Sequence, residues 1–145
     1  MKRIAFFVEG QTEQIFVYRL VKDILGKDHV NVMLKQYVGG TKITKQELTK
    51  DFIIARNPRY DVLISNCGAD NRVKSEIMEN ITNLRAKGYS MIVGLRDLYP
   101  IPIDDYEKLE HGLKFLPNNL RQHASHFDII IAVHEIEAWF LAETN

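Results

Sequence analysis

Hydrophobic residues in this chain occur in short continuous runs that alternate with longer stretches of helical spacing. The short runs are rich in β-branched and aromatic residues, which is typical of strands buried on both faces. They predict strands at 3–8, 30–38, 61–66, 91–97 and 128–133. The stretches between them predict helices at 12–25, 70–88 and 104–116, and a last helix that begins at 136. This alternation predicts an α/β fold with a mainly parallel central sheet and helices on both faces.

The ends of the first helix carry residues that favour its formation. Thr12 is expected to be the N-cap of the helix at 12–25, and Glu13 lies in the first turn, where the helix dipole favours an acid. Two neighbouring segments are less regular. The strand at 30–38 contains polar residues and is expected near an edge of the sheet, whereas the basic segment 42–56 has no clear period and is expected to be weakly helical or mobile.

Length and composition indicate one ordinary globular unit. The chain has 145 residues, of which 46% are hydrophobic and 26% charged, so we expect a single domain over 1–145. The last predicted helix reaches the end of the sequence, so the domain could be part of a longer protein. It shows neither a signal-peptide pattern nor a run of about 18 apolar residues that would span a membrane. We therefore expect a cytoplasmic protein without a membrane segment. Cys67, the one cysteine, can form no internal disulfide and is expected to be a small buried residue.

The charge is balanced overall but not along the chain. Residues 1–87 hold 15 lysines and arginines against 10 acidic residues, and residues 88–145 hold 4 against 9. This asymmetry is compatible with a basic surface that binds phosphates beside an acidic metal site. Its simpler interpretation is solvated surface charge.

Acidic residues follow three of the predicted strands. Glu9 ends the first apolar run, Asp97 follows the run at 91–95, and Glu135 and Glu137 follow the last strand. Because parallel strands end at the same edge of a sheet, these carboxylates are expected to converge. Converging carboxylates repel one another unless protons or a divalent cation intervene. The sequence therefore predicts a metal site.

Each acid also has a structural interpretation. Glu9 could accept hydrogen bonds from the amides of the next helix, and Asp97 could form a turn before Tyr-Pro. Glu13 is a common type of first-turn residue. Glu135 and Glu137 are two positions apart, so they point in different directions, and the sequence leaves open whether one or both reach the metal.

A second group of residues is suited to phosphate. Gly10 permits a close approach of the backbone, Thr12 stands at a helix N-terminus that can hold an anion, and Arg96 precedes Asp97. Further cations that could contact a nucleic-acid backbone, or serve only as solubilising charge, are Lys42, Lys45 and Lys50.

Three short motifs carry a resemblance to a known family. The segment 8–13, Val-Glu-Gly-Gln-Thr-Glu, resembles the first motif of the TOPRIM superfamily, the domain shared by topoisomerases, bacterial primases and overcoming-lysogenization-defect nucleases. The segment 95–99 falls where that superfamily carries an Asp-x-Asp motif. The segment 134–142 resembles more narrowly a bacterial family of TOPRIM-like proteins of undetermined function, encoded near ABC-type ATPases and suspected of phage defence.

The resemblance implies a TOPRIM/Rossmann-like fold and a Mg²⁺-dependent or Mn²⁺-dependent nuclease. It implies catalytic roles for Glu9 and Glu13 and a metal site formed by Glu9, Asp97, Glu135 and Glu137. A metal would stabilise the charge that develops during displacement at phosphorus. The implied partners are nucleic acid, DNA before RNA, and an ABC-type ATPase, and a homo-oligomer is left open.

The chain departs from the TOPRIM pattern at one position. Tyr99 stands where the second Asp of the Asp-x-Asp motif is expected, and Asp104 or Asp105 could replace that acid from the following loop. The departure favours an alternative function, a catalytically weak module that binds nucleotide, nucleic acid or a partner protein. A third interpretation is a flavodoxin-like domain that binds a phosphorylated ligand without metal.

Overall fold

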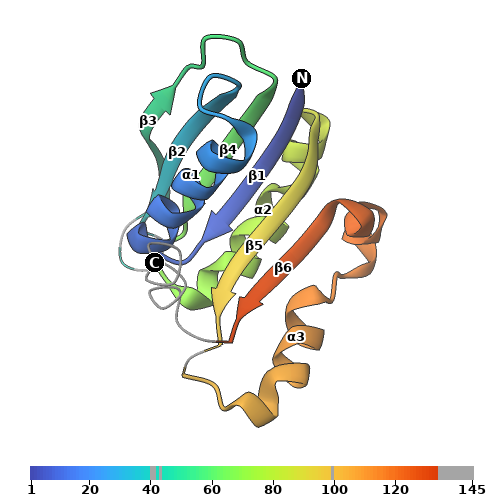
Figure 1. The fold of residues 1–145 in the computed structure, drawn as a ribbon. Helices are drawn as coiled ribbons and strands as arrows, with labels where there is room; N and C mark the ends of the chain where they lie inside the picture. Colours follow the sequence, from blue (N-terminus) through green and yellow to red (C-terminus); the bar gives the residue numbers. More distant parts are fainter. Residues whose placement is uncertain (40–41, 43, 99, 134–145) are drawn as a thin grey trace.

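The computed structural model describes residues 1–39, 42, 44–98 and 100–133. Its strands are β1 (Lys2–Val8), β2 (Val30–Val38), β3 (Gln46–Ile53), β4 (Tyr60–Asn66), β5 (Tyr89–Asp97) and β6 (Phe127–Ala132). Its helices are α1 (Gln11–Leu25), α2 (Val73–Ala86) and α3 (Tyr106–Lys114), with 3₁₀ segments at Asp70–Arg72, Ile103–Asp105 and Asn118–His126 (Figure 1).

Within these residues the strands form one sheet in the order β3-β2-β4-β1-β5-β6. All neighbouring pairs are parallel except β2 with β3, which is antiparallel. The α/β prediction with a mainly parallel sheet is therefore confirmed. The carboxyl ends of β1, β2, β4, β5 and β6 lie at one edge of the sheet, which appears at the bottom of Figure 1.

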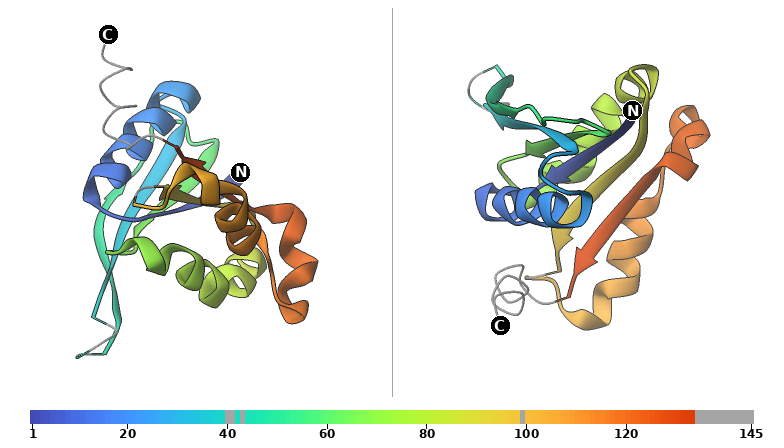
Figure 2. Two further views of the ribbon diagram at one scale, coloured as in Figure 1. Left: turned by 90° about the horizontal axis from the view of Figure 1, so that it is seen from below. Right: turned by 45° about the horizontal axis from the view of Figure 1, so that its top comes forward.

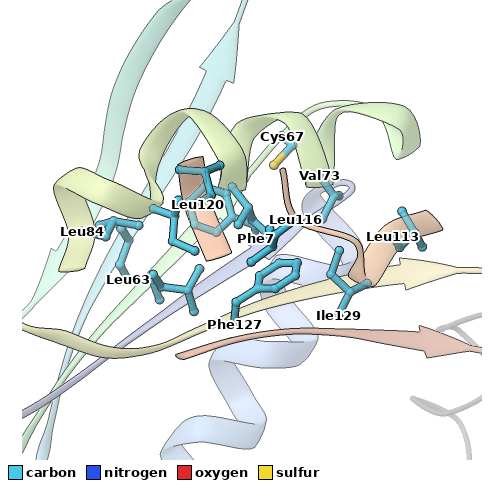
Figure 3. Close-up of a cluster of buried hydrophobic side chains, with 14 of the residues drawn as sticks. Phe7, Leu63, Cys67, Val73, Leu84, Leu113, Leu116, Leu120, Phe127 and Ile129 are labelled. Carbon is cyan, nitrogen blue, oxygen red and sulfur yellow. The ribbon is translucent and has the colours of Figure 1, made fainter. Parts of the chain in front are cut away.

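The helices lie on both faces of the sheet, as predicted (Figure 2). Phe7 of β1 points to the face covered by α2 and α3, where it packs with residues such as Phe127 and Ile129 (Figure 3). Its neighbour Val8 points to the opposite face, where α1 contributes residues such as Phe16. Among the described residues, no helix combines the length and the apolar character needed to cross a membrane.

The segment 42–56 differs from its prediction, because residues 46–53 form strand β3. This strand pairs with β2 through a register that shifts between Leu34 and Lys35, and nearly all of its residues are exposed. A strand that is open to solvent on both faces needs no alternation of apolar and polar residues. The pattern of hydrophobicity therefore did not predict β3. Strand β2 lies next to the edge strand β3, and so near an edge of the sheet as predicted.

Gly94 of β5 sits where α2 packs most closely on the sheet. A Cβ atom at this position would lie 2.9 Å from Ile77 Cδ1, 3.0 Å from Val73 Cγ1 and 3.1 Å from Ile129 Cγ1. Gly94→Ala is therefore expected to lower the free energy of unfolding by about 1–3 kcal/mol, measured by urea denaturation. Gly112→Ala is the control, because nothing lies within 4 Å of its Cβ position. Equal stability of the two variants would contradict the close packing at β5.

Candidate metal centre

Three carboxylates meet at the carboxyl edge of the sheet. Glu9 directly follows β1, Glu13 lies in the first turn of α1, and Asp97 is the last residue of β5. Each offers an oxygen atom, and these atoms all lie within 4.8 Å of one another. Glu9 and Glu13 are 6% and 8% exposed, and Asp97 is half-buried. The structure thus brings together three of the acids that the sequence singled out.

Gly10 allows Glu13 to fold back towards Glu9. It is the N-cap of α1, and its carbonyl accepts the first helical hydrogen bond, from Gln14 N at 3.1 Å. A Cβ atom on Gly10 would lie only 3.1 Å from Glu13 Oε2, so a side chain here would press on the carboxylate. The helix begins at Gln11, and the prediction that Thr12 is the N-cap is wrong, because Gly10 already takes that position. Thr12 is exposed in the first turn.

Gln14 fixes the start of α1 over the sheet, a role that sequence reasoning missed. Its side chain is 3% exposed, and its Nε2 donates hydrogen bonds of 2.9 Å to the carbonyl oxygens of Lys35 in β2 and Ile64 in β4. These bonds satisfy a buried amide and hold the first helical turn, with Glu13, above the ends of two strands. The sequence carried no signal of this role, because a polar residue near a helix start is ordinarily exposed.

Glu9 is itself held in place by β5. Its Oε1 accepts a hydrogen bond from the backbone N–H of Asp97 at 3.0 Å, so β1 and β5 are linked beyond the end of their ladder. Arg96 Nε lies 4.0 Å from the same oxygen. The guanidinium therefore offsets part of the negative charge of the cluster.

The cluster lies where the connections of the sheet diverge. From β1 the chain passes through α1 to β2, which lies towards the β3 edge of the sheet. From β5 it passes through α3 to β6, which forms the opposite edge. These crossings also use opposite faces of the sheet (Figure 2). In open α/β sheets, ligands bind outside the carboxyl ends of the strands at such a point.

A family model for a domain of unknown function (DUF4276) matches residues 8–145. The chain belongs to the DUF4276 family. No curated protein and no solved structure matches it. The matched range includes every residue of the carboxylate cluster.

The remaining predicted ligands of this DUF4276 domain are Glu135 and Glu137. Both lie outside the residues that the structure describes, as does Tyr99. Asp104 and Asp105, considered as replacements for an acid at position 99, are exposed in a 3₁₀ segment and do not belong to the carboxylate group found in the described part of the chain. The described cluster therefore draws its carboxylates from the first motif and the end of β5.

Of the basic residues considered for nucleic-acid binding, Lys45 has a structural role. Its Nζ donates hydrogen bonds to both carboxylate oxygens of Glu76, at 3.0 and 3.1 Å, and it also contacts Glu79. The hydrogen bond to Glu79, with a smaller contribution from Glu76, raises the pKa of Lys45. Lys50 remains exposed on β3. The interpretation of Lys45 as a free phosphate contact is therefore not supported.

Cys67 is fully buried just after β4, as the sequence predicted. Burial, with a contribution from the charge of Glu76, raises the pKa of the thiol to about 12. Because the thiolate is the reactive form, iodoacetamide at near-neutral pH is expected to label the folded DUF4276 domain far more slowly than the urea-unfolded chain. Mass spectrometry of both samples measures the difference. Fast labelling of the folded protein would show that the Cys67 thiol is not buried in this way. Cys67 would then be a candidate nucleophile.

Proposed function

We propose that this DUF4276 domain is a TOPRIM-like, Mg²⁺-dependent nuclease that cleaves phosphodiester bonds, with Mn²⁺ able to replace Mg²⁺. The convergence of Glu9, Glu13 and Asp97 at the carboxyl edge of the sheet carries this proposal. By resemblance to the TOPRIM-like family, the proposal extends to DNA as the preferred substrate, to the cytoplasm as location and to an ABC-type ATPase as partner in phage defence.

The ligand atoms of the cluster fit a hard divalent cation. Glu9, Glu13 and Asp97 offer only carboxylate oxygens, which suit Mg²⁺ and Mn²⁺. Three carboxylates this close repel one another, and a bound cation would remove that cost. A cation bound by these carboxylates would act as a Lewis acid that stabilises the negative charge developing on the phosphate. It would also lower the pKa of a water molecule bound to it.

The protein residues around the cluster have complementary tasks. Glu9 and Asp97, tied together by the hydrogen bond between Glu9 Oε1 and Asp97 N, would hold the cation in a fixed place. Glu13 is within reach of the same point and would serve as a further ligand or as the acceptor of a proton from the attacking water. Arg96 and the N-terminus of α1, which includes Gly10 and Thr12, would receive the negative charge of the phosphate.

A second candidate function is a catalytically weak module that binds nucleotide, nucleic acid or a partner protein. The residue at position 99 favours it, because Tyr99 replaces the second acid of the Asp-x-Asp motif. With one carboxylate fewer, the site has fewer ligands for a second cation. Two-metal phosphodiester cleavage requires that second cation.

One experiment separates these candidates. Mn²⁺ binding is measured by electron paramagnetic resonance, and cleavage of supercoiled plasmid and of single-stranded RNA is followed with Mg²⁺, with Mn²⁺ and with a chelator. The nuclease proposal expects Mn²⁺ binding together with cleavage that the chelator stops. Metal binding without cleavage of either substrate would favour the binding module, and absence of metal binding would overturn the nuclease proposal.

A further inference from the structure

Gln14 is a buried polar residue that adjoins the carboxylate cluster without belonging to it. Its side chain is 3% exposed, and it follows Glu13 in the first turn of α1. The carboxylate group found in the described part of the chain consists of Glu9, Glu13 and Asp97. Burying an amide costs free energy unless its polar atoms find partners, so the contacts of Gln14 show what it does in the fold.

The amide nitrogen of Gln14 bridges two strands. Nε2 carries two hydrogens, and it donates hydrogen bonds of 2.9 Å to the carbonyl oxygens of Lys35 in β2 and Ile64 in β4. The two strands are neighbours, with Leu34 paired to Ile64, so the side chain spans the seam between them. Both acceptors are backbone atoms of strands that are paired in the sheet. They therefore give the first turn of α1 a fixed position relative to the sheet.

The three carboxylates are attached to the fold in different ways. Glu9 directly follows β1 and Asp97 ends β5, so the strands themselves place these two. Glu13 is carried by a helix, and packed helices can slide by small distances over the surface beneath them. Oxygens of the three acids lie within 4.8 Å of one another, and their repulsion pushes the start of α1 away from the strands. The hydrogen bonds of Gln14 oppose this displacement.

We infer that Gln14 is a positioning residue of the metal centre, which holds Glu13 close enough to Glu9 and Asp97 for the three to share one cation. The inference rests on the proposed metal-dependent function and deepens it. Groups that orient metal ligands without touching the metal typically change metal affinity by about 10–100-fold when they are replaced. Gln14 acts in this way through Glu13, because the two residues are adjacent in the turn that it anchors.

Gln14→Met removes both hydrogen bonds while keeping an unbranched side chain of similar length. The affinity for Mn²⁺, measured by electron paramagnetic resonance, is expected to fall by roughly 10–100-fold. In the metal-free protein, hydrogen exchange of the amides at the start of α1 is expected to become faster, because the turn is no longer tied to β2 and β4. Thermal unfolding identifies a temperature at which the variant is folded, and all titrations are done there.

Asn31 offers a matched control near the amino end of β2, away from the cluster. It is 9% exposed, its Nδ2 donates to Asp61 Oδ1 at 2.9 Å, and its Oδ1 accepts from Ala55 N at 2.8 Å. Asn31→Leu therefore also removes two hydrogen bonds of a buried amide. It is expected to lower the melting temperature as Gln14→Met does, but to leave the Mn²⁺ affinity and the exchange at the start of α1 unchanged.

A double-variant cycle tests whether Gln14 acts through Glu13. In the Glu13→Gln background this ligand is already lost, so adding Gln14→Met is expected to change the Mn²⁺ affinity by less than about twofold. The same 10–100-fold loss in both backgrounds would overturn the inference, and so would an equal loss in Asn31→Leu. The exchange measurement needs no metal, so unchanged exchange in Gln14→Met would overturn it even where the double variant binds too little Mn²⁺ to titrate.

Failure of this inference can be distinguished from failure of the proposed function. If the wild type binds Mn²⁺ and Gln14→Met binds it equally well, only the role of Gln14 is refuted. If the wild type binds no Mn²⁺, the proposed function is refuted together with this inference.

Discussion

Glu9→Gln is expected to lower metal-dependent cleavage of plasmid DNA by about 10²–10⁴-fold, the range for loss of a group that takes part directly in the chemistry. The reason is its position close to the other two carboxylates. An oxygen of Glu9 lies within 4.8 Å of one from Glu13 and one from Asp97, and the side chain is almost entirely buried. Neutralising it removes a charge that the solvent cannot replace. Mn²⁺ affinity, measured by electron paramagnetic resonance, is expected to fall together with cleavage.

Glutamine is the informative replacement because it keeps the structural contact. Its side-chain oxygen can still accept the hydrogen bond that Asp97 N donates to Glu9 Oε1. The melting temperature of Glu9→Gln is therefore expected to stay close to that of the wild type, which separates loss of charge from loss of fold. Asp104→Asn is the control, since Asp104 is an exposed acid outside the cluster. Cleavage that survives Glu9→Gln but is lost in Asp104→Asn would place the metal elsewhere.

The presence of parallel strands and the position of two acids at their carboxyl ends were predictable from the sequence. Continuous apolar runs that end at Glu9 and Asp97 predict buried strands whose carboxyl ends meet. That β1 and β5 are neighbours could not be deduced, because the sheet order is set by packing between segments far apart in the chain. The local cause of the geometry was also hidden. Gly10 matters here for its small size next to Glu13, which no pattern of hydrophobicity reports.

Segments with polar side chains were harder to predict. Gln14 is polar and near a helix start, where an exposed residue is the ordinary expectation, yet it is buried by two bonds to carbonyls of β2 and β4. Strand β3 has an exposed surface on both faces, so its pairing with β2 left no trace in the pattern. In both cases the stabilising partners are backbone groups of other strands. A single sequence does not reveal such partners.

The turn end of the β2–β3 hairpin is joined to α2 through a buried charge. Glu76 of α2 is 2% exposed, and its carboxylate is held by Lys45, with Arg72 Nη2 at 3.6 Å as a weaker partner. Lys45 also lies over Tyr37 of β2, 5.6 Å from the ring centre. The lysine therefore links the residues just before β3 both to β2 and to the helix on the face of the sheet.

Lys45→Met is expected to lower the free energy of unfolding by about 2–3 kcal/mol, somewhat less than the roughly 3–5 kcal/mol for a fully buried pair, because Arg72 and partial exposure compensate. The loss arises from Glu76, which stays buried without its main partner. Adding Glu76→Met to Lys45→Met is therefore expected to restore most of the stability, since neither charge then remains. Urea denaturation of the two single variants and the double variant measures the coupling. If the double variant were as unstable as the sum of the single ones, the hairpin would be held by packing of the lysine stem and not by its charge.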